Sequence, residues 1–244
     1  MTTGEPAAPE QSESGNSLLN AVKEIVIVLV CALVLSVLVR TFLVQAFYVP
    51  SQSMENTLMV NDRIIASKIN TKIGGVNRGE VVVFKDPGNW LPESHSNAGP
   101  VQKAMEFIGV LPSSSGDDLV KRVIGVAGDR VVCCSPSGQI VLNGVVLNEP
   151  YIKPGSSTNQ KVFDVTVPDD SIFVMGDNRE ASADSRFHLD ENDGAVPVGN
   201  VVGKVVLKVW PFSQFGTVGT PEVFDDPALN KNPGAGLLPS AGEK

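Results

Sequence analysis

One long apolar segment constrains this chain more than any other feature of its sequence. From Ile25 to Val39 there is no charged residue, and apolar residues resume after Arg40 and continue to Val49. At about 1.5 Å per residue, this run alone covers roughly 22 Å of a hydrocarbon core about 30 Å thick, so a complete span must extend toward Phe47. We therefore expect a transmembrane signal-anchor helix over residues 21–47, in contact with membrane lipid.

Two other structures could explain the same segment. One is a cleaved secretory signal, whose apolar region is typically about 7–15 residues long, and the other is a buried core helix. No basic cluster precedes the run and no small-x-small site follows it before Arg40, which favours an uncleaved, single-pass anchor. Lys23 is the one base before the span, whereas Arg40, Arg63 and Lys68 follow it. Taken alone, this distribution places the following domain on the cytoplasmic side.

Composition argues against two classes of protein. The formal net charge is −8, whereas nucleic-acid binding requires clustered Lys and Arg, so we expect no nucleic-acid partner. Three cysteines and two histidines are too few for a disulfide framework or for zinc-finger spacing. We therefore expect no metal and no cofactor.

Residues 48–220 contain short β-branched runs separated by turn signals, which predicts an all-β domain. The predicted strands are Arg63–Ala66, Glu80–Phe84, Val120–Val126, Arg130–Val132, Gln139–Leu142, Lys161–Val167, Ser171–Met175 and Val201–Val209. Asn143-Gly144 lies between two apolar runs and predicts a hairpin with a type I′ turn.

Three other segments are poor in packing residues. The tails at 1–20 and 221–244 are rich in Pro, Gly, Ser and Glu, and we expect both to be disordered. Residues 89–118 are rich in Pro, Ser, Asn and Gly, and we expect a surface insertion between two strands.

The sequence offers few bases for hydrolytic chemistry. His95 and His188 have no evident Ser or Asp companions, so both are interpreted as surface residues. Lys121 is another candidate, because strand alternation places it on one face with Leu119 and Val123. A lysine with a pKa near 10.4 must lose about 2–3 units, or roughly 3–4 kcal/mol, to act as a base. Taken alone, however, Lys121 is better explained as a residue at a sheet edge.

Two polar clusters could supply the remaining groups. Ser51, Ser53 and Thr57 follow Pro50 directly after the apolar segment, where they could also form a capped loop. The run from Gly176 to Arg186 follows a predicted strand and could be a solvated turn with internal ion pairs.

Together these segments resemble the signature boxes of type I signal peptidases, the membrane-anchored Ser-Lys proteases that remove signal peptides from exported proteins. Pro50-Ser-Gln-Ser-Met resembles the nucleophile box, and Lys121-Arg-Val-Ile-Gly resembles the lysine box. Gly176-Asp-Asn-Arg with Ser182-Ala-Asp-Ser-Arg resembles the third box. Each motif is weak alone, but three in order behind an N-terminal span are specific. The resemblance covers about residues 20–215.

The resemblance implies roles for particular residues. Ser53 would be the nucleophile and Lys121 the general base, while Ser182 would hydrogen-bond and orient the lysine amine. Ser51 would contribute its hydroxyl to the oxyanion hole beside the Ser53 backbone N–H.

The resemblance also implies the surroundings of the site. Asp177 with Arg122, and Asp184 with Arg186, would form structural ion pairs. The residues implied to bind substrate, in pockets that favour Ala-x-Ala, are Phe47, Val49, Pro50, Met54, Leu58, Leu119 and Val120. The expected partners are signal-peptide-bearing preproteins.

The implied fold is an all-β catalytic domain of coiled antiparallel sheets, similar to signal peptidases and to the LexA repressor, behind one N-terminal transmembrane helix. The implied location is the cell membrane, with the catalytic domain on its extracytoplasmic face. The sequence departs from the family at Asn56, where many members have Pro, and at Glu180-Ala181, where Asp-Asn is common. We expect altered loop rigidity there, with activity retained.

Two alternatives to a signal peptidase stay open on sequence alone. A self-cleaving protease of the LexA type would need an N-terminal DNA-binding domain, for which residues 1–24 are too short and too acidic. An anchored β-domain could instead bind a partner without catalysis.

The adjacent cysteines Cys133 and Cys134 could form a vicinal disulfide, bridge to another chain or stay reduced. Because neighbouring strand residues point to opposite faces, we expect free or separately buried thiols. Cys31, inside the apolar segment, is expected to be a packing residue.

Overall fold

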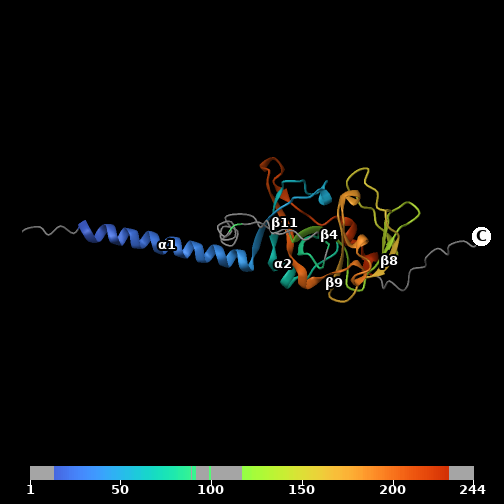
Figure 1. Ribbon diagram of the computed structural model, residues 1–244, viewed down its shortest axis with the longest axis horizontal. Helices are drawn as coiled ribbons and strands as arrows, with labels where there is room; N and C mark the ends of the chain where they lie inside the picture. Colours follow the sequence, from blue (N-terminus) through green and yellow to red (C-terminus); the bar gives the residue numbers. More distant parts are fainter. Residues whose placement is uncertain (1–13, 89, 92–98, 100–116, 231–244) are drawn as a thin grey trace, which may run out of the picture.

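The computed structural model describes residues 14–88, 90–91, 99 and 117–230. Helix α1 (Ser14–Phe42) projects away from a β domain (Figure 1). It contains a 21-residue segment, Leu19–Val39, that is long and apolar enough to cross a membrane. At 1.5 Å per residue this segment is about 31 Å long, which matches the hydrocarbon core.

Both predicted boundaries of the anchor were wrong. The helix begins at Ser14, inside the predicted tail, and ends at Phe42 rather than at residue 47. Residues Val44–Tyr48 form strand β1, which pairs antiparallel with β2 (Arg63–Ser67). Phe47 and Val49 are each 2% exposed, so the apolar run after Arg40 ends in the protein core, whereas Phe42 and Leu43 remain exposed.

The strands form two antiparallel sheets, so the all-β prediction is confirmed. The larger, eight-stranded sheet has the order β1-β2-β11-β3-β4-β9-β10, with β12 paired to β11. The smaller sheet has the order β7-β6-β5-β8. The remaining strands of the larger sheet are β3 (Val81–Lys85), β4 (Asp118–Val126), β9 (Ser171–Met175), β10 (Val196–Pro197), β11 (Val201–Trp210) and β12 (Gly216–Thr217). Those of the smaller sheet are β5 (Arg130–Cys133), β6 (Ile140–Leu142), β7 (Val145–Val146) and β8 (Phe163–Thr166).

Short helices complete the connections between strands. They are α2 (Lys68–Ile73) and the 3-10 helices η1 (Gln52–Met54), η2 (Arg179–Ala181), η3 (Ser185–Phe187), η4 (Asn192–Gly194), η5 (Val198–Asn200), η6 (Phe212–Gln214), η7 (Glu222–Asp225) and η8 (Pro227–Asn230). The β6–β7 hairpin has positive φ at Asn143 and at Gly144, as its type I′ sequence predicts. Most of the predicted insertion at 89–118 lies outside the described residues, although β4 already begins at Asp118.

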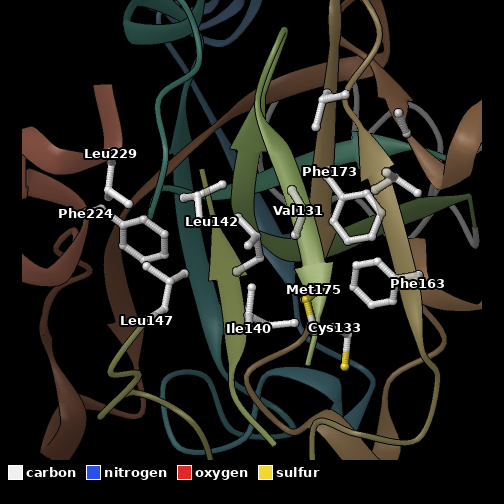
Figure 2. Close-up of a cluster of buried hydrophobic side chains, with 14 of the residues drawn as sticks. Val131, Cys133, Ile140, Leu142, Leu147, Phe163, Phe173, Met175, Phe224 and Leu229 are labelled. Atoms are coloured by element: carbon white, nitrogen blue, oxygen red, sulfur yellow. The ribbon is translucent and has the colours of Figure 1, made fainter. Parts of the chain in front are cut away.

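The predicted C-terminal tail begins too early. Phe224 and Leu229 are buried at 7% and 0% exposure. Figure 2 shows them beside Leu142 and Leu147 at the edge of a cluster that also joins the smaller sheet to β9. Burial of these two apolar side chains stabilises the packing of this Pro-rich segment against the domain.

The prediction of free thiols was also wrong. Cys133 and Cys134 are joined by a disulfide. The alternation argument does not apply, because β5 ends at Cys133 and Cys134 lies beyond the strand.

Candidate active site

The proposed nucleophile lies in a short turn that the protein core holds in place. Strand β1 leads into the exposed Pro50, and Ser53 is the central residue of helix η1. Val49 precedes it and is 2% exposed, and Met54 and Leu58 follow it and are 1% and 0% exposed. Because its flanking residues are anchored in the core, the turn presents Ser53 in a defined position.

Lys121 reaches this serine from strand β4. Its Nζ atom lies 2.7 Å from the Ser53 Oγ and 3.1 Å from the carbonyl oxygen of Val120. The lysine is 3% exposed. Burial lowers its pKa from 10.5 to about 8, while the carboxylates of Asp184 and Asp177 oppose this shift. A lysine of this kind can exist as the neutral base at near-neutral pH.

The two other predicted serines have different surroundings. Ser51 Oγ lies 3.1 Å from Ser53 Oγ, next to the nucleophile as expected. Ser182 is 4% exposed, and its hydroxyl faces the carboxylate of Asp184, where it helps to lower the pKa of that group. The Lys121 amine bonds to Ser53 and to Val120, and the orienting role of Ser182 stays a prediction.

Gly176 allows the end of β9 to lie close to Ser53 and Ser182. The sequence alone did not indicate this role. A methyl group at this position would overlap the carbonyl oxygen of Ser53 and the hydroxyl of Ser182. It would also lie only 2.6 Å from the Ser182 Cβ. Only glycine lets the end of β9 approach the nucleophile turn this closely.

Gly176→Ala should therefore displace the nucleophile. We expect kcat/KM to fall by about a hundredfold and the free energy of unfolding by about 1–3 kcal/mol, because the added methyl group overpacks the site. Cleavage kinetics and urea denaturation measure the two effects. Gly199→Ala is the matched control, since a methyl group there meets nothing within 4 Å. Unchanged kinetics in Gly176→Ala would contradict this view of the site.

The first predicted ion pair joins Arg122, the residue after Lys121 in β4, to Asp177. Arg122 donates to both carboxylate oxygens of Asp177, at 2.9 and 2.7 Å, and the two residues are 1% and 0% exposed. Thr57 donates to the same carboxylate at 2.5 Å. The Arg122 guanidinium also lies 4.3 Å from the ring centre of Tyr151. The pair thereby ties β4 to the loop after β9 and to the nucleophile segment.

The second predicted ion pair is also formed. Arg186 donates to both oxygens of Asp184, at 2.8 and 2.9 Å. Burial by itself would raise the pKa of Asp184, but the hydrogen bond and charge of Arg186 hold it below its usual value. Asp184 also accepts from the Gly176 N–H at 3.0 Å, so this pair fixes the glycine that contacts Ser53.

The sequence reasoning missed a third buried pair. Arg179 donates to Glu149 at 2.6 Å, and their side chains are 0% and 4% exposed. Arg179 lies within the third box, but no sequence signal identifies Glu149, which comes from the loop after β7.

The predicted substrate-binding residues fall into two groups. One buried apolar cluster contains most of them: Phe47, Val49, Met54 and Leu58, with Val120 packed against it. Leu119 packs instead against the cluster around Val123. Pro50 is exposed at the start of the nucleophile turn.

Of the two histidines, His188 lies among the described residues and contacts no proposed catalytic group. The His188 ring stacks on Trp90, with ring centres 4.4 Å apart. His95 lies outside the described residues. Among the residues that the structure describes, no group of three or more His, Cys, Asp or Glu could hold a metal ion.

A serine hydrogen-bonded to a buried lysine of lowered pKa, with a second hydroxyl beside it, is the arrangement of a hydrolase with an activated nucleophile. The comparisons with known proteins agree with this class. The family model for "Signal peptidase, peptidase S26" matches residues 22–210. The chain therefore belongs to the signal peptidase family, peptidase S26, and the resemblance seen in the sequence is confirmed.

Individual relatives extend over most of the chain. A probable signal peptidase I of Mycobacterium leprae is 38% identical, covering 82% of this chain and 80% of the relative. The signal peptidase I of Mycobacterium tuberculosis is 38% identical, covering 88% and 81%. The crystal structure of a signal peptidase I from Enterococcus faecalis is 24% identical, with a TM-score of 0.34, and covers 53% of this chain and 95% of its own.

Proposed function

We propose that Ser53 and Lys121 form the catalytic dyad of a membrane-anchored serine endopeptidase. Cleavage of signal peptides from exported preproteins is the activity of the family to which the chain belongs. The observation that carries the assignment of the dyad is the 2.7 Å contact between the Lys121 amine and the Ser53 hydroxyl in a buried setting. A β-domain that only binds a partner would not need to bury a lysine next to a serine.

Each group has one task in this mechanism. Neutral Lys121 takes the Ser53 proton as Ser53 Oγ attacks the scissile carbonyl carbon. The Ser53 N–H and the Ser51 hydroxyl stabilise the oxyanion of the tetrahedral intermediate. The lysine then gives the proton to the leaving amine, and the signal peptide stays bound to Ser53 as an ester. Lys121 next accepts a proton from the water that attacks the ester carbon, and it returns this proton to Ser53 Oγ as the ester bond breaks and the signal peptide leaves.

The sheet offers a place for an extended substrate. Strand β3 pairs with β4 from Asp118 to Arg122, whereas β9 pairs with β4 only from Arg122 onward. Along Leu119–Lys121, the β4 edge opposite β3 therefore faces no strand of the described residues. A substrate strand added there would lie beside Lys121, with main-chain bonds giving affinity and small pockets selecting Ala at P1 and P3.

We infer that this domain lies on the extracytoplasmic face, where translocated preproteins are accessible. The basic residues after the span favour the opposite side, so the proposal depends on where the substrates are accessible. Membrane lipid is the second proposed partner. The loop between β11 and β12 lies at the end of the domain that α1 joins (Figure 1), and it exposes Phe212 and Phe215 at 75% and 61%. Exposed aromatic rings suit a membrane interface. The mechanism uses no metal, cofactor or nucleic acid.

The pH dependence of cleavage tests the dyad. Only neutral Lys121 can accept the proton, so kcat/KM should rise about tenfold per pH unit below pH 8 and level off above the lysine pKa of about 8. The measurement is cleavage of a preprotein with Ala-x-Ala before the scissile bond. A peptide without titratable groups next to that bond controls for titration of the substrate. A flat profile, or an inflection near the usual pKa of lysine, would argue against Lys121 as the base.

A further inference from the structure

We propose that Asn178 is a positioning residue for the oxyanion hole, because its side-chain amide sets the direction of the Ser53 backbone N–H. This inference rests on the proposed function, since it takes Ser53 as the nucleophile and its N–H as an oxyanion donor. Asn178 follows β9 and is 3% exposed. It lies within the third box, but the sequence analysis gave it no role.

Asn178 makes three hydrogen bonds to the nucleophile turn. Its backbone N–H donates to the carbonyl oxygen of Ser53 at 3.0 Å. Its Nδ2 donates to the carbonyl oxygen of Gln52 at 3.1 Å and to Glu55 Oε2 at 3.2 Å. Both side-chain partners are acceptors, so the NH₂ group and not the amide oxygen must face the turn. Each of its two hydrogens then has one partner.

The bond to Gln52 acts on Ser53 because both residues share one peptide group. The cis peptide bonds of the described residues precede Cys134 and Pro211, so the Gln52–Ser53 peptide is trans. In a planar trans peptide the C=O and the N–H point in opposite directions. Holding the Gln52 oxygen toward Asn178 therefore directs the Ser53 N–H away from it. The same bond polarises the peptide and makes this N–H a stronger donor.

The rest of the turn is fixed on the same side. The Gln52 oxygen also accepts from the Glu55 N–H at 3.1 Å within η1. Asn178 adds its side-chain bond to this oxygen and its backbone bond to the next carbonyl oxygen, so the turn cannot rotate without breaking all three. Glu55, the third partner, also accepts from Lys153 Nζ at 2.7 Å. That lysine side chain is 44% exposed, so its contact lies at the outer edge of the cluster and contributes little.

Asn178→Asp tests this role, because the carboxylate keeps the shape but replaces the donor with a charge facing two acceptors. We expect kcat to fall by about ten- to a hundredfold and KM to change by less than about threefold, as for a misaligned oxyanion donor. The inflection of the pH profile should stay near 8 in Asn178→Ala, which adds no charge, whereas the new carboxylate of Asn178→Asp should move it upward, as the carboxylates of Asp177 and Asp184 already do for the Lys121 pKa.

A peptide aldehyde ending in Ala provides a readout that a purely structural role would not move. Ser53 Oγ adds to the aldehyde carbon and the serine proton passes to the former carbonyl oxygen, which then occupies the oxyanion position. In Asn178→Asp the affinity for the aldehyde should fall by the same factor as kcat. The affinity for the product peptide of the same sequence, which needs no oxyanion donor, should stay unchanged.

Lys153→Met is the matched control, since it removes the outer contact and leaves the Gln52 bond intact. If Asn178→Asp does not fold, Asn178→Ala removes the donor without placing a charge beside Glu55, and the same measurements decide. The proposal is overturned if a folded variant keeps kcat and aldehyde affinity within about threefold of wild type, or loses aldehyde and product affinity equally. Failure of the dyad itself is a different result: Ser53→Ala would then bind the aldehyde as tightly as the wild type.

Discussion

Replacing Lys121 by methionine should abolish preprotein cleavage and, at pH 7, make the folded domain more stable. Cleavage should fall by about a thousandfold or more, because no base remains to take the Ser53 proton. Stability should rise because methionine fills the same space without a buried amine. Burial lowers the pKa of Lys121 to about 8, so at pH 7 the wild-type protein folds around a mostly charged ammonium.

The sign of this effect follows from linkage. The pKa of Lys121 is 10.5 when the group is solvated and about 8 in the folded protein. The folded state is therefore penalised below pH 8, by up to about 3 kcal/mol, and the penalty disappears as the pH rises toward 10.5. The stability advantage of the methionine variant should shrink by about 2–3 kcal/mol between pH 7 and pH 10.

Urea denaturation of both proteins at several pH values measures this difference directly, since titration of all other groups is common to both. Ser53→Ala is the control, because it should also abolish cleavage but show no pH-dependent gain over wild type. A constant stability difference between wild type and Lys121→Met across this pH range would show that the lysine is not desolvated. Cleavage by Lys121→Met at a wild-type rate would eliminate the mechanism.

Most of the fold could be predicted because its signals are local. The strand from Ser171 to Met175 is bounded by turn residues on both sides, and its predicted and observed limits coincide. The anchor boundary could not be predicted this way. Phe47 is apolar both in a bilayer and in a core, so composition does not distinguish β1 from a continued span. Phe224 and Leu229 were missed for the related reason that two isolated side chains leave no periodic pattern.

Some residues of the candidate site could likewise be identified from the sequence, and others could not. Ser53 and Lys121 could be identified because they lie in short motifs in the right order, and the structure brings their side chains together. Glu149 could not be identified, because its partner Arg179 lies 30 positions away and only the fold makes them neighbours. The roles of Gly176 and Asn178 depend on close approach between two loops, and a single sequence does not reveal such contacts.

The buried pair of Arg122 and Asp177 should be far more costly to break than an ion pair at the surface. Asp177→Asn leaves a guanidinium charge without its carboxylate in a site where Arg122 is 1% exposed. We expect the free energy of unfolding to fall by about 3–5 kcal/mol, because the remaining charge keeps its desolvation penalty without the compensating attraction. Arg122→Met should also destabilise the protein, but by less, because the Asp177 carboxylate keeps Thr57 as a neutral donor.

The double variant Arg122→Met/Asp177→Asn separates the pair from its members. With both charges gone, it should be at least about 1–2 kcal/mol more stable than the sum of the two single effects predicts, as for groups that interact directly. Asp164→Asn is the matched control. Asp164 pairs with Arg130 at the surface, where the side chains are 46% and 29% exposed, so its loss should cost less than about 1 kcal/mol. If urea denaturation gave equal losses for Asp177→Asn and Asp164→Asn, burial would not determine the strength of these pairs. The Arg122–Asp177 pair would then contribute no more to the free energy of unfolding than an exposed ion pair does.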